Sequence, residues 1–191
     1  MLKGQDIVIL LKILSRANLA KVRHEELLSQ NKLAVQLCMS VSEVHAGIKR
    51  LVLSGLLGQV TGVNAGRNSN RKHFLPIIAA CEECLLSAVK FFIPAELGTY
   101  TRGIATSYAA PIFKQHIVLG DDPIPVWPSA DGKQRGLALE PLYRSVPNSL
   151  SQYPDDLFYE LLVLVDTIRS GRTRERNIAV KLLKARINSE K

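Results

Sequence analysis

The sequence predicts a mainly α-helical fold with a small amount of β-structure. Apolar residues recur at three- and four-residue spacing near both ends of the chain, which is the spacing of amphipathic helices. A period-two pattern on either side of residues 64–71 predicts a hairpin. Residues 93–150 hold seven of the nine prolines, which excludes long regular helices there. We therefore expect two parts: residues 1–76, and a mostly helical C-terminal subdomain at 77–191 that contains an irregular, proline-rich segment and a hairpin.

The first predicted helix covers residues 4–17 and is apolar on more than one side. Its apolar residues are Ile7, Val8, Ile9, Leu10, Leu11, Ile13 and Leu14. Such a helix must bury more than one face, either in a core or against a second subunit. Residues 18–30 are predicted as a weaker helix or a loop.

A short helix at Asn31–Leu37, a turn at residues 38–40 and a helix at Val41–Ser54 follow. Ser40 is a favourable N-cap, and Glu43 three residues later completes a capping-box pattern. The apolar residues that pin the two helices together are Leu33, Ala34, Leu37, Met39, Val44, Ile48, Leu51 and Val52. The opposite face of the second helix carries Ser42, Glu43, Ala46, Lys49 and Arg50, with His45 at its edge. Small, polar and basic side chains on that face suit a DNA major groove.

This segment resembles the winged helix-turn-helix of bacterial transcriptional regulators over roughly residues 4–76. The matching residues are Leu33-Ala34, Leu37, Ser40, Val44, Ile48, Leu51 and Gly55-Leu56-Leu57. The resemblance implies that helix 41–54 is the recognition helix and that the tip of the hairpin formed by residues 59–63 and 72–76 is a wing. Cys38 departs from the pattern, because a glycine is common in the turn. Gly47 also departs from it, at a cost of about 1 kcal/mol relative to alanine in mid-helix.

Twelve residues are the predicted DNA contacts. Those of the helix and its cap are Ser40, Ser42, Glu43, His45, Ala46, Lys49 and Arg50, and those of the wing are Arg67, Asn68, Asn70, Arg71 and Lys72. Within this set, Ser42, Ala46, Lys49 and Arg50 are expected to meet the major groove. Wing residues are expected to meet the backbone or the minor groove.

The distribution of charge favours DNA as the partner. The formal net charge is +8, and residues 1–75 carry eleven Lys and Arg against four Asp and Glu. Asp6 and Lys12 flank the apolar run 7–11, so we expect neither a signal peptide nor a membrane span there. These features predict a cytoplasmic, sequence-specific regulator that binds double-stranded DNA, with no membrane association. The apolar first helix and the two-fold symmetry of operator half-sites predict a homodimer.

No catalytic, metal-binding or cofactor-binding residues are predicted. Cys81 and Cys84 match the CxxC spacing, but on a helix they share a face with apolar neighbours and are better explained as buried small side chains. The sequence has no glycine-rich phosphate loop and no HExxH motif. We therefore expect no enzyme and no cofactor.

The remaining predicted elements are a helix at 77–92, a hairpin of strands 123–128 and 134–139 around an Asp-Gly turn, and two closing helices at 155–169 and 173–187. Residues 169–186 carry seven Lys and Arg against the single acid Glu175. This basic cluster is expected to be a solvated face, or else a second contact to the DNA backbone or to an acidic partner.

Two other functions remain open. One is an antitoxin-like or adaptor protein that binds a protein partner through its C-terminal half and also represses its own promoter. The other is architectural nucleic-acid binding with little sequence preference, which a steep salt dependence would reveal.

Overall fold

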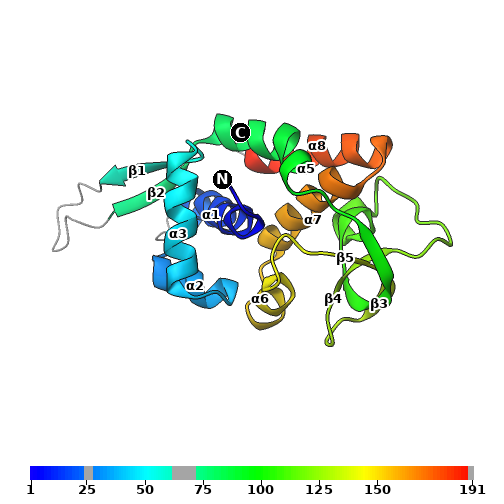
Figure 1. Cartoon of the computed structure of the whole chain (residues 1–191). Coiled ribbons are helices and arrows are strands. Elements are labelled where there is room, and N and C mark those ends of the chain that lie inside the picture. Colours follow the sequence, from blue (N-terminus) through cyan, green and yellow to red (C-terminus); the bar gives the residue numbers. More distant parts are fainter. Residues whose placement is uncertain (24–27, 62–71, 189–191) are drawn as a thin grey trace.

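The computed structural model of the chain describes residues 1–23, 28–61 and 72–188 (Figure 1). The helices are α1 (Gly4–Arg23), α2 (Gln30–Leu37), α3 (Val41–Leu53), α4 (Ile78–Glu83), α5 (Val89–Phe92), α6 (Val146–Gln152), α7 (Asp156–Ser170) and α8 (Thr173–Ile187). The strands are β1 (Leu57–Thr61), β2 (Lys72–Pro76), β3 (Leu97–Ala105), β4 (Pro125–Pro128) and β5 (Gln134–Leu139). The fold is thus mixed, with helices dominating and small sheets, as the sequence predicts.

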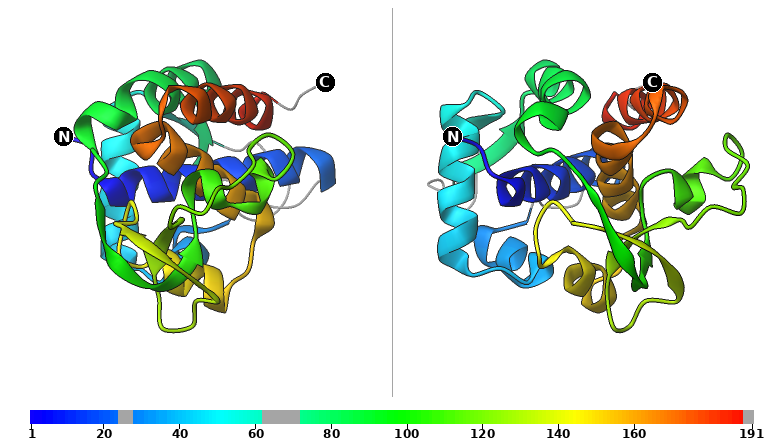
Figure 2. Two further views of the ribbon diagram at one scale, coloured as in Figure 1. Left: turned by 90° about the vertical axis from the view of Figure 1, so that its right-hand side faces the viewer. Right: turned by 45° about the vertical axis from the view of Figure 1, so that its right-hand side comes forward.

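Helix α1 crosses the middle of the molecule, with α3 on one side and α7 on the other (Figures 1 and 2). The side chains of Ile7 through Leu11 are fully buried, as expected for a helix that is apolar on several faces. The core of the same chain covers them, and no second subunit is needed to do so. This burial removes the apolar first helix as an argument for a dimer.

Two buried charges on α1 connect it to both neighbours. Asp6 pairs with Arg50 of α3, and Lys12 donates a 2.7 Å hydrogen bond to Asp155, the N-cap of α7. Burial lowers the pKa of Lys12, while its hydrogen bond to Asp155 opposes that shift. Helix α1 therefore belongs equally to the N-terminal and C-terminal parts of the chain.

Helices α2 and α3 meet through the tight turn predicted at residues 38–40. Cys38 adopts a left-handed conformation with φ 51°, the conformation for which glycine is common at this position. The capping box of Ser40 and Glu43 is present. The glycine at 47 is explained by packing, since an added Cβ would lie 2.5 Å from the Cδ1 atom of Ile9 in α1.

Strands β1 and β2 form the predicted antiparallel hairpin, with Leu57 opposite Pro76 and Thr61 opposite Lys72. The first strand begins at Leu57, two residues before the predicted start. Most of the predicted wing tip, including Arg67, Asn68, Asn70 and Arg71, lies outside the described residues.

The helix predicted over residues 77–92 is present, but its middle is not a regular α-helix. Residues Cys84–Ala88 form a π-helical segment between α4 and α5. Cys81 is fully buried and its Sγ donates a 3.3 Å hydrogen bond to the carbonyl of Leu56. Burial raises the pKa of Cys81 to about 12, so this thiol acts as a buried small side chain, as predicted.

The hairpin predicted from 123–128 and 134–139 is wrong in its pairing. Both strands exist, but β4 and β5 run parallel to each other, and each pairs antiparallel with β3 to close a small three-stranded barrel (Figure 2). The connection between them crosses β3 where Gly132 lies on Gly103, and a Cβ on either glycine would collide with backbone. The Asp-Gly segment is therefore a crossover between the two edges of β3. Strand β3 itself lies in the segment predicted to be irregular.

The two closing helices match their predictions to within one residue. Helix α7 starts after its N-cap Asp155 and is buried almost throughout, and α8 packs along it. A single hydrophobic core runs from Ile7 of α1 to Ile187 of α8. The domain boundary at residue 76 remains a prediction, and side chains from both sides of it share this core.

Candidate nucleic-acid interface

The outer face of α3 carries exposed polar and basic side chains. Ser42, His45 and Lys49 are exposed, and Ala46 between them is half-buried. Their spacing of three and four residues places them on one stripe of the helix. The hairpin β1–β2 projects from the same end of the molecule, whereas the barrel β3–β5 lies at the opposite end (Figure 1). This arrangement puts α3 and the start of the predicted wing within one surface region.

The neighbouring position Arg50 is engaged inside the protein. Its Nε and Nη2 atoms donate to the two carboxylate oxygens of Asp6 at 2.8 and 2.7 Å. Asp6 is fully buried and also accepts from the backbone N–H of Lys3. Two of the five N–H donors of Arg50 are thus committed to this bidentate pair. The structure gives Arg50 a role in joining α3 to α1.

Glu43 also faces the rest of the protein. Its Oε2 accepts from the backbone N–H and the hydroxyl of Ser40 at 2.8 Å, and its Oε1 accepts from the hydroxyl of Tyr143. The Tyr143 hydrogen bond, followed by those from Ser40, lowers the pKa of Glu43 to about 2. Glu43 is therefore an anion that caps α3 and connects its first turn to the C-terminal part.

Residues 143–152 contact the α2–α3 pair at two further points. The hydroxyl of Ser149 in α6 donates to the Gln36 carbonyl at 2.6 Å, and Cys38 in the turn lies 3.7 Å from the Oε1 of Gln152. Tyr143 and Ser149 are not among the residues predicted from the sequence. No local signal could reveal them, because their partners are 100 and 113 residues away in the chain.

The other predicted contacts are placed as follows. Ser40 is exposed as the N-cap of α3, and the Nδ1 of His45 lies 3.1 Å from the Oε1 of Gln30 in α2. Lys72 begins β2, opposite Thr61 at the end of β1. The remaining wing residues lie outside the described residues. The structure thus brings Ser42, His45, Ala46 and Lys49 together.

The basic cluster at residues 169–186 is largely used in contacts within the protein. Three of its side chains pair with acids: Arg169 with Asp166, Lys184 with Glu82 and Arg186 with Glu160. Arg176 donates to the carbonyls of Ile168 and Gly171. Arg172, Arg174 and Lys181 are exposed. The positive charge presented to a partner is therefore much smaller than the sequence suggests.

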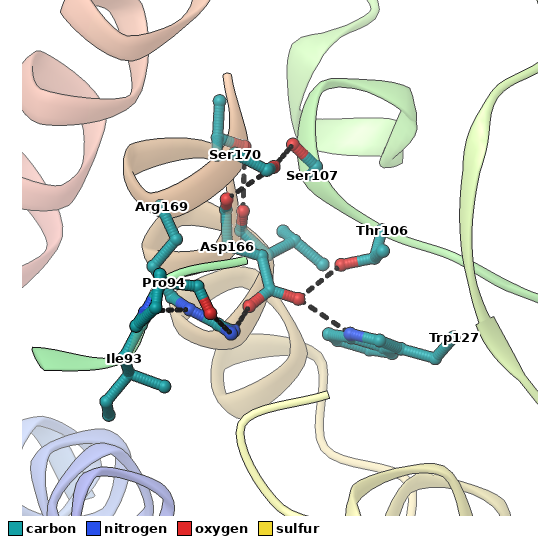
Figure 3. Close-up of polar contacts among 10 residues, drawn as sticks. Ile93, Pro94, Thr106, Ser107, Trp127, Asp166, Arg169 and Ser170 are labelled. Atoms are coloured by element: carbon teal, nitrogen blue, oxygen red, sulfur yellow. Dashed lines mark hydrogen bonds and ion pairs between the residues drawn. The ribbon is translucent and has the colours of Figure 1, made fainter. Parts of the chain in front are cut away.

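A deeply buried polar cluster centres on Asp166 of α7 (Figure 3). Its carboxylate accepts from the Nε1 of Trp127 at 2.6 Å, from Thr106 at 3.0 Å and from Arg169 at 2.6 Å. Arg169 also donates to the carbonyl of Ile93. Burial raises the pKa of Asp166, while Arg169 and the hydrogen bonds oppose that shift. Because Asp166 is fully buried and Arg169 is 8% exposed, this cluster holds the barrel against α7.

The described residues contain no group of three or more His, Cys, Asp or Glu side chains that could hold a metal ion. Within the same parts of the chain, no helix has both the length and the apolar character required to cross a bilayer.

Comparisons of the chain with protein-family models, with curated proteins and with solved structures found no match.

Proposed function

We propose that this protein is a sequence-specific, double-stranded DNA-binding regulator of the winged helix-turn-helix class, with α3 as its recognition helix. One observation carries the proposal: the stripe of Ser42, His45, Ala46 and Lys49 is presented to solvent on a helix that is capped and packed on its other sides. Apart from the exposed Leu53 at its C-terminal end, the outer face of α3 is small, polar and basic, which fits a major groove about 12 Å wide. The excess of positive charge in residues 1–75 supports the same partner.

Each side chain has its own role in this proposal. Lys49 is the base-reading cation, since a lysine can donate to the O6 and N7 acceptors of guanine. Ser42 and Ala46 lie beside it and are short enough to allow close approach of the helix backbone. Arg50 and Glu43 act as positioning residues through Asp6 and Tyr143, and the wing supplies phosphate or minor-groove contacts.

The test is a selection of bound fragments from a random pool of DNA duplexes, followed by affinity measurements on the enriched sequence. We expect a defined consensus, and we expect the double variant Ser42→Ala with Lys49→Ala to lose at least about tenfold in affinity, since a good base contact contributes about 1–3 kcal/mol of discrimination. Arg50 is left unchanged because its removal would leave Asp6 without its partner.

Lys181→Ala is the matched control, because Lys181 is also an exposed lysine, on α8. It should retain the consensus and the affinity. A pool without enrichment would favour architectural binding, and an unchanged affinity in the double variant would exclude α3 as the recognition helix.

A homodimer remains part of the proposal on one ground, the two-fold symmetry of most operators of this class. Light scattering during size-exclusion chromatography measures it directly. A monomer both free and on the selected DNA would remove dimerisation from the proposal.

A protein partner bound by the C-terminal half is the second candidate, and exposed apolar side chains favour it. Phe91 is 77% exposed, Leu97 is 51% exposed and Tyr100 is 59% exposed, all within a short stretch from α5 into β3. Exposed aromatic side chains of this kind are enriched at protein interfaces. Co-purification from the native host would test this candidate: a stoichiometric partner that is lost on Phe91→Ser supports it.

A further inference from the structure

A small basic pocket is formed by residues of β3, β5 and the segment between β4 and β5. The barrel that these strands form lies at the end of the molecule away from α3 (Figure 1). The register of β3 and β5 places Arg102 directly opposite Arg135. Directly opposed residues of an antiparallel pair point to the same face, with Cβ atoms about 4.5–5.5 Å apart. Both arginines are exposed and line the same pocket, so this face carries two neighbouring positive charges.

The crossover between β4 and β5 adds a third positive charge. After Pro128 the chain passes over β3 at Gly132 and Gly103, and it then brings Lys133 to the start of β5. The resulting pocket has a volume of about 560 Å³. Its lining residues are Arg102, Ala130, Asp131, Gly132, Lys133, Gln134 and Arg135. Asp131 is the single acid among them, which leaves the lining with two net positive charges.

The charges of this pocket have no ionic partner within residues 1–23, 28–61 and 72–188, in contrast to the paired cations of α7 and α8. Like charges directly opposite each other on adjacent strands destabilise a sheet. An anion between Arg102 and Arg135 would convert this repulsion into attraction. Arginine is the side chain best suited to this task, since its planar fork donates two parallel hydrogen bonds to a phosphate.

We propose that this pocket binds the phosphate group of a small phosphorylated ligand that also carries hydroxyl groups, such as a nucleotide. Arg102 and Arg135 hold the phosphate from two sides, Lys133 adds charge, and the carboxylate of Asp131 accepts from a ligand hydroxyl. The pocket is open and its charged lining side chains are exposed, which suits a phosphate group held at the surface of the protein. The site lies at the opposite end from α3, so it stands independently of DNA binding.

The direct test is isothermal titration of the whole protein with inorganic pyrophosphate and with adenosine triphosphate, at constant ionic strength. We expect saturable binding to a single site. Arg102→Gln and Arg135→Gln should each lower the affinity at least about tenfold, equivalent to about 1.4 kcal/mol. Arg135→Lys should lose less than Arg135→Gln, because it keeps the charge but not the bidentate geometry.

Arg174→Gln is the matched control, since Arg174 is an exposed arginine on α8. It should bind both ligands as the unchanged protein does. No saturable binding by the unchanged protein, or the same loss in Arg174→Gln as in Arg135→Gln, would overturn the proposal. The proposal would also be wrong if the protein bound neither ligand and Arg135→Gln lowered its affinity for DNA. In that case the pocket would be a contact for the DNA backbone.

Thermal unfolding supplies a second readout that also guards against a misfolded variant. Without phosphate, Arg135→Gln should unfold at the same temperature as the unchanged protein or slightly above it, because the variant removes a repulsion. Pyrophosphate should raise the unfolding temperature of the unchanged protein but not that of the variant. Two results together would contradict a phosphate held by Arg135. These are a variant with a lower unfolding temperature than the unchanged protein without phosphate, and an equal rise in unfolding temperature for both proteins when pyrophosphate is added.

Discussion

The basic cluster of α7 and α8 and the basic pocket of the barrel differ in how their charges are satisfied. The cluster at residues 169–186 is richer in Lys and Arg, yet Arg169, Lys184 and Arg186 each pair with an acid. The pocket has fewer cations, but Arg102 and Arg135 lie directly opposite each other on the adjacent strands β3 and β5. The number of Lys and Arg residues in a stretch of sequence therefore does not indicate how many of them are available to bind a ligand. The acids that the fold brings to each region decide which cations remain available.

The outer and inner sides of α3 show the same contrast on a smaller scale. Lys49 is exposed, and its neighbour Arg50 is engaged by the buried Asp6. Of these two consecutive cations of α3, Lys49 is thus available to a partner and Arg50 is paired within the protein. Variants of Arg169, of Arg50 with Lys49, and of Arg174 with Lys181 test this division between paired and available cations, and a variant of Tyr143 tests the corresponding contact of the Glu43 anion.

The largest effect is expected for Arg169→Ala. This change leaves the fully buried carboxylate of Asp166 without its positive partner, and breaking a buried ion pair costs about 3–5 kcal/mol. Urea unfolding monitored by the fluorescence of Trp127, which donates to the same carboxylate, measures the loss. A loss below about 1 kcal/mol would show that the remaining hydrogen bonds satisfy Asp166, since a typical hydrogen bond contributes about that much.

Arg50→Ala is expected to lower the free energy of unfolding by about 2 kcal/mol. The change leaves the carboxylate of Asp6 buried with a single remaining donor, the Lys3 N–H. Lys49→Ala is the matched neighbour and should change the free energy of unfolding by less than about 0.5 kcal/mol. The two variants are compared by urea unfolding under the same conditions. Equal losses would abolish the distinction between the two positions.

Tyr143→Phe tests the contact between α3 and the C-terminal part, and we expect a loss of about 1 kcal/mol at neutral pH. Glu43 has a folded-state pKa of about 2, below its ordinary value of 4.5. Its contribution to stability is therefore present above pH 4.5 and is lost as the pH falls toward 2. In the variant the pKa of Glu43 should rise.

The stability of Tyr143→Phe should accordingly change less between pH 4.5 and 2 than that of the unchanged protein. Thermal unfolding across this window measures the difference. Parallel acid profiles for the two proteins would mean that Tyr143 does not stabilise the Glu43 anion.

The smallest effect is expected for Arg174→Gln and Lys181→Gln, the exposed cations of α8. Each should change the free energy of unfolding by less than about 0.5 kcal/mol, as is usual for surface substitutions. Thermal unfolding at low and high salt measures both. A larger loss that disappears at high salt would reveal an electrostatic contact of these residues within the folded protein.

The parts of the fold that depend on local sequence could be predicted. The capping box of Ser40 and Glu43, the turn at Cys38 and the limits of α7 and α8 all follow from residues within a few positions of each other. The helical positions of the outer stripe of α3 follow from the period of the helix. For these elements the local pattern and the final structure agree.

The parts that depend on long-range pairing could not be predicted. The parallel arrangement of β4 and β5 requires β3, which lies in a proline-rich segment without a clear strand pattern. The partners of Arg50 and Glu43 are Asp6 and Tyr143, 44 and 100 residues away. A helical projection shows only that these two side chains lie outside the apolar face of α3. It does not show whether they meet solvent or an acid or hydroxyl from a distant part of the chain.

The position of α1 between α3 and α7 has a consequence for work with fragments of this protein. A fragment that ends at residue 76 would contain the complete predicted DNA-binding segment but would lack α7, so one apolar side of α1 would meet water. It would also leave Lys12 without Asp155. Such a fragment is expected to aggregate or to lose its fixed packing, and a failure of residues 1–76 to bind DNA would therefore say nothing about α3 in the whole chain.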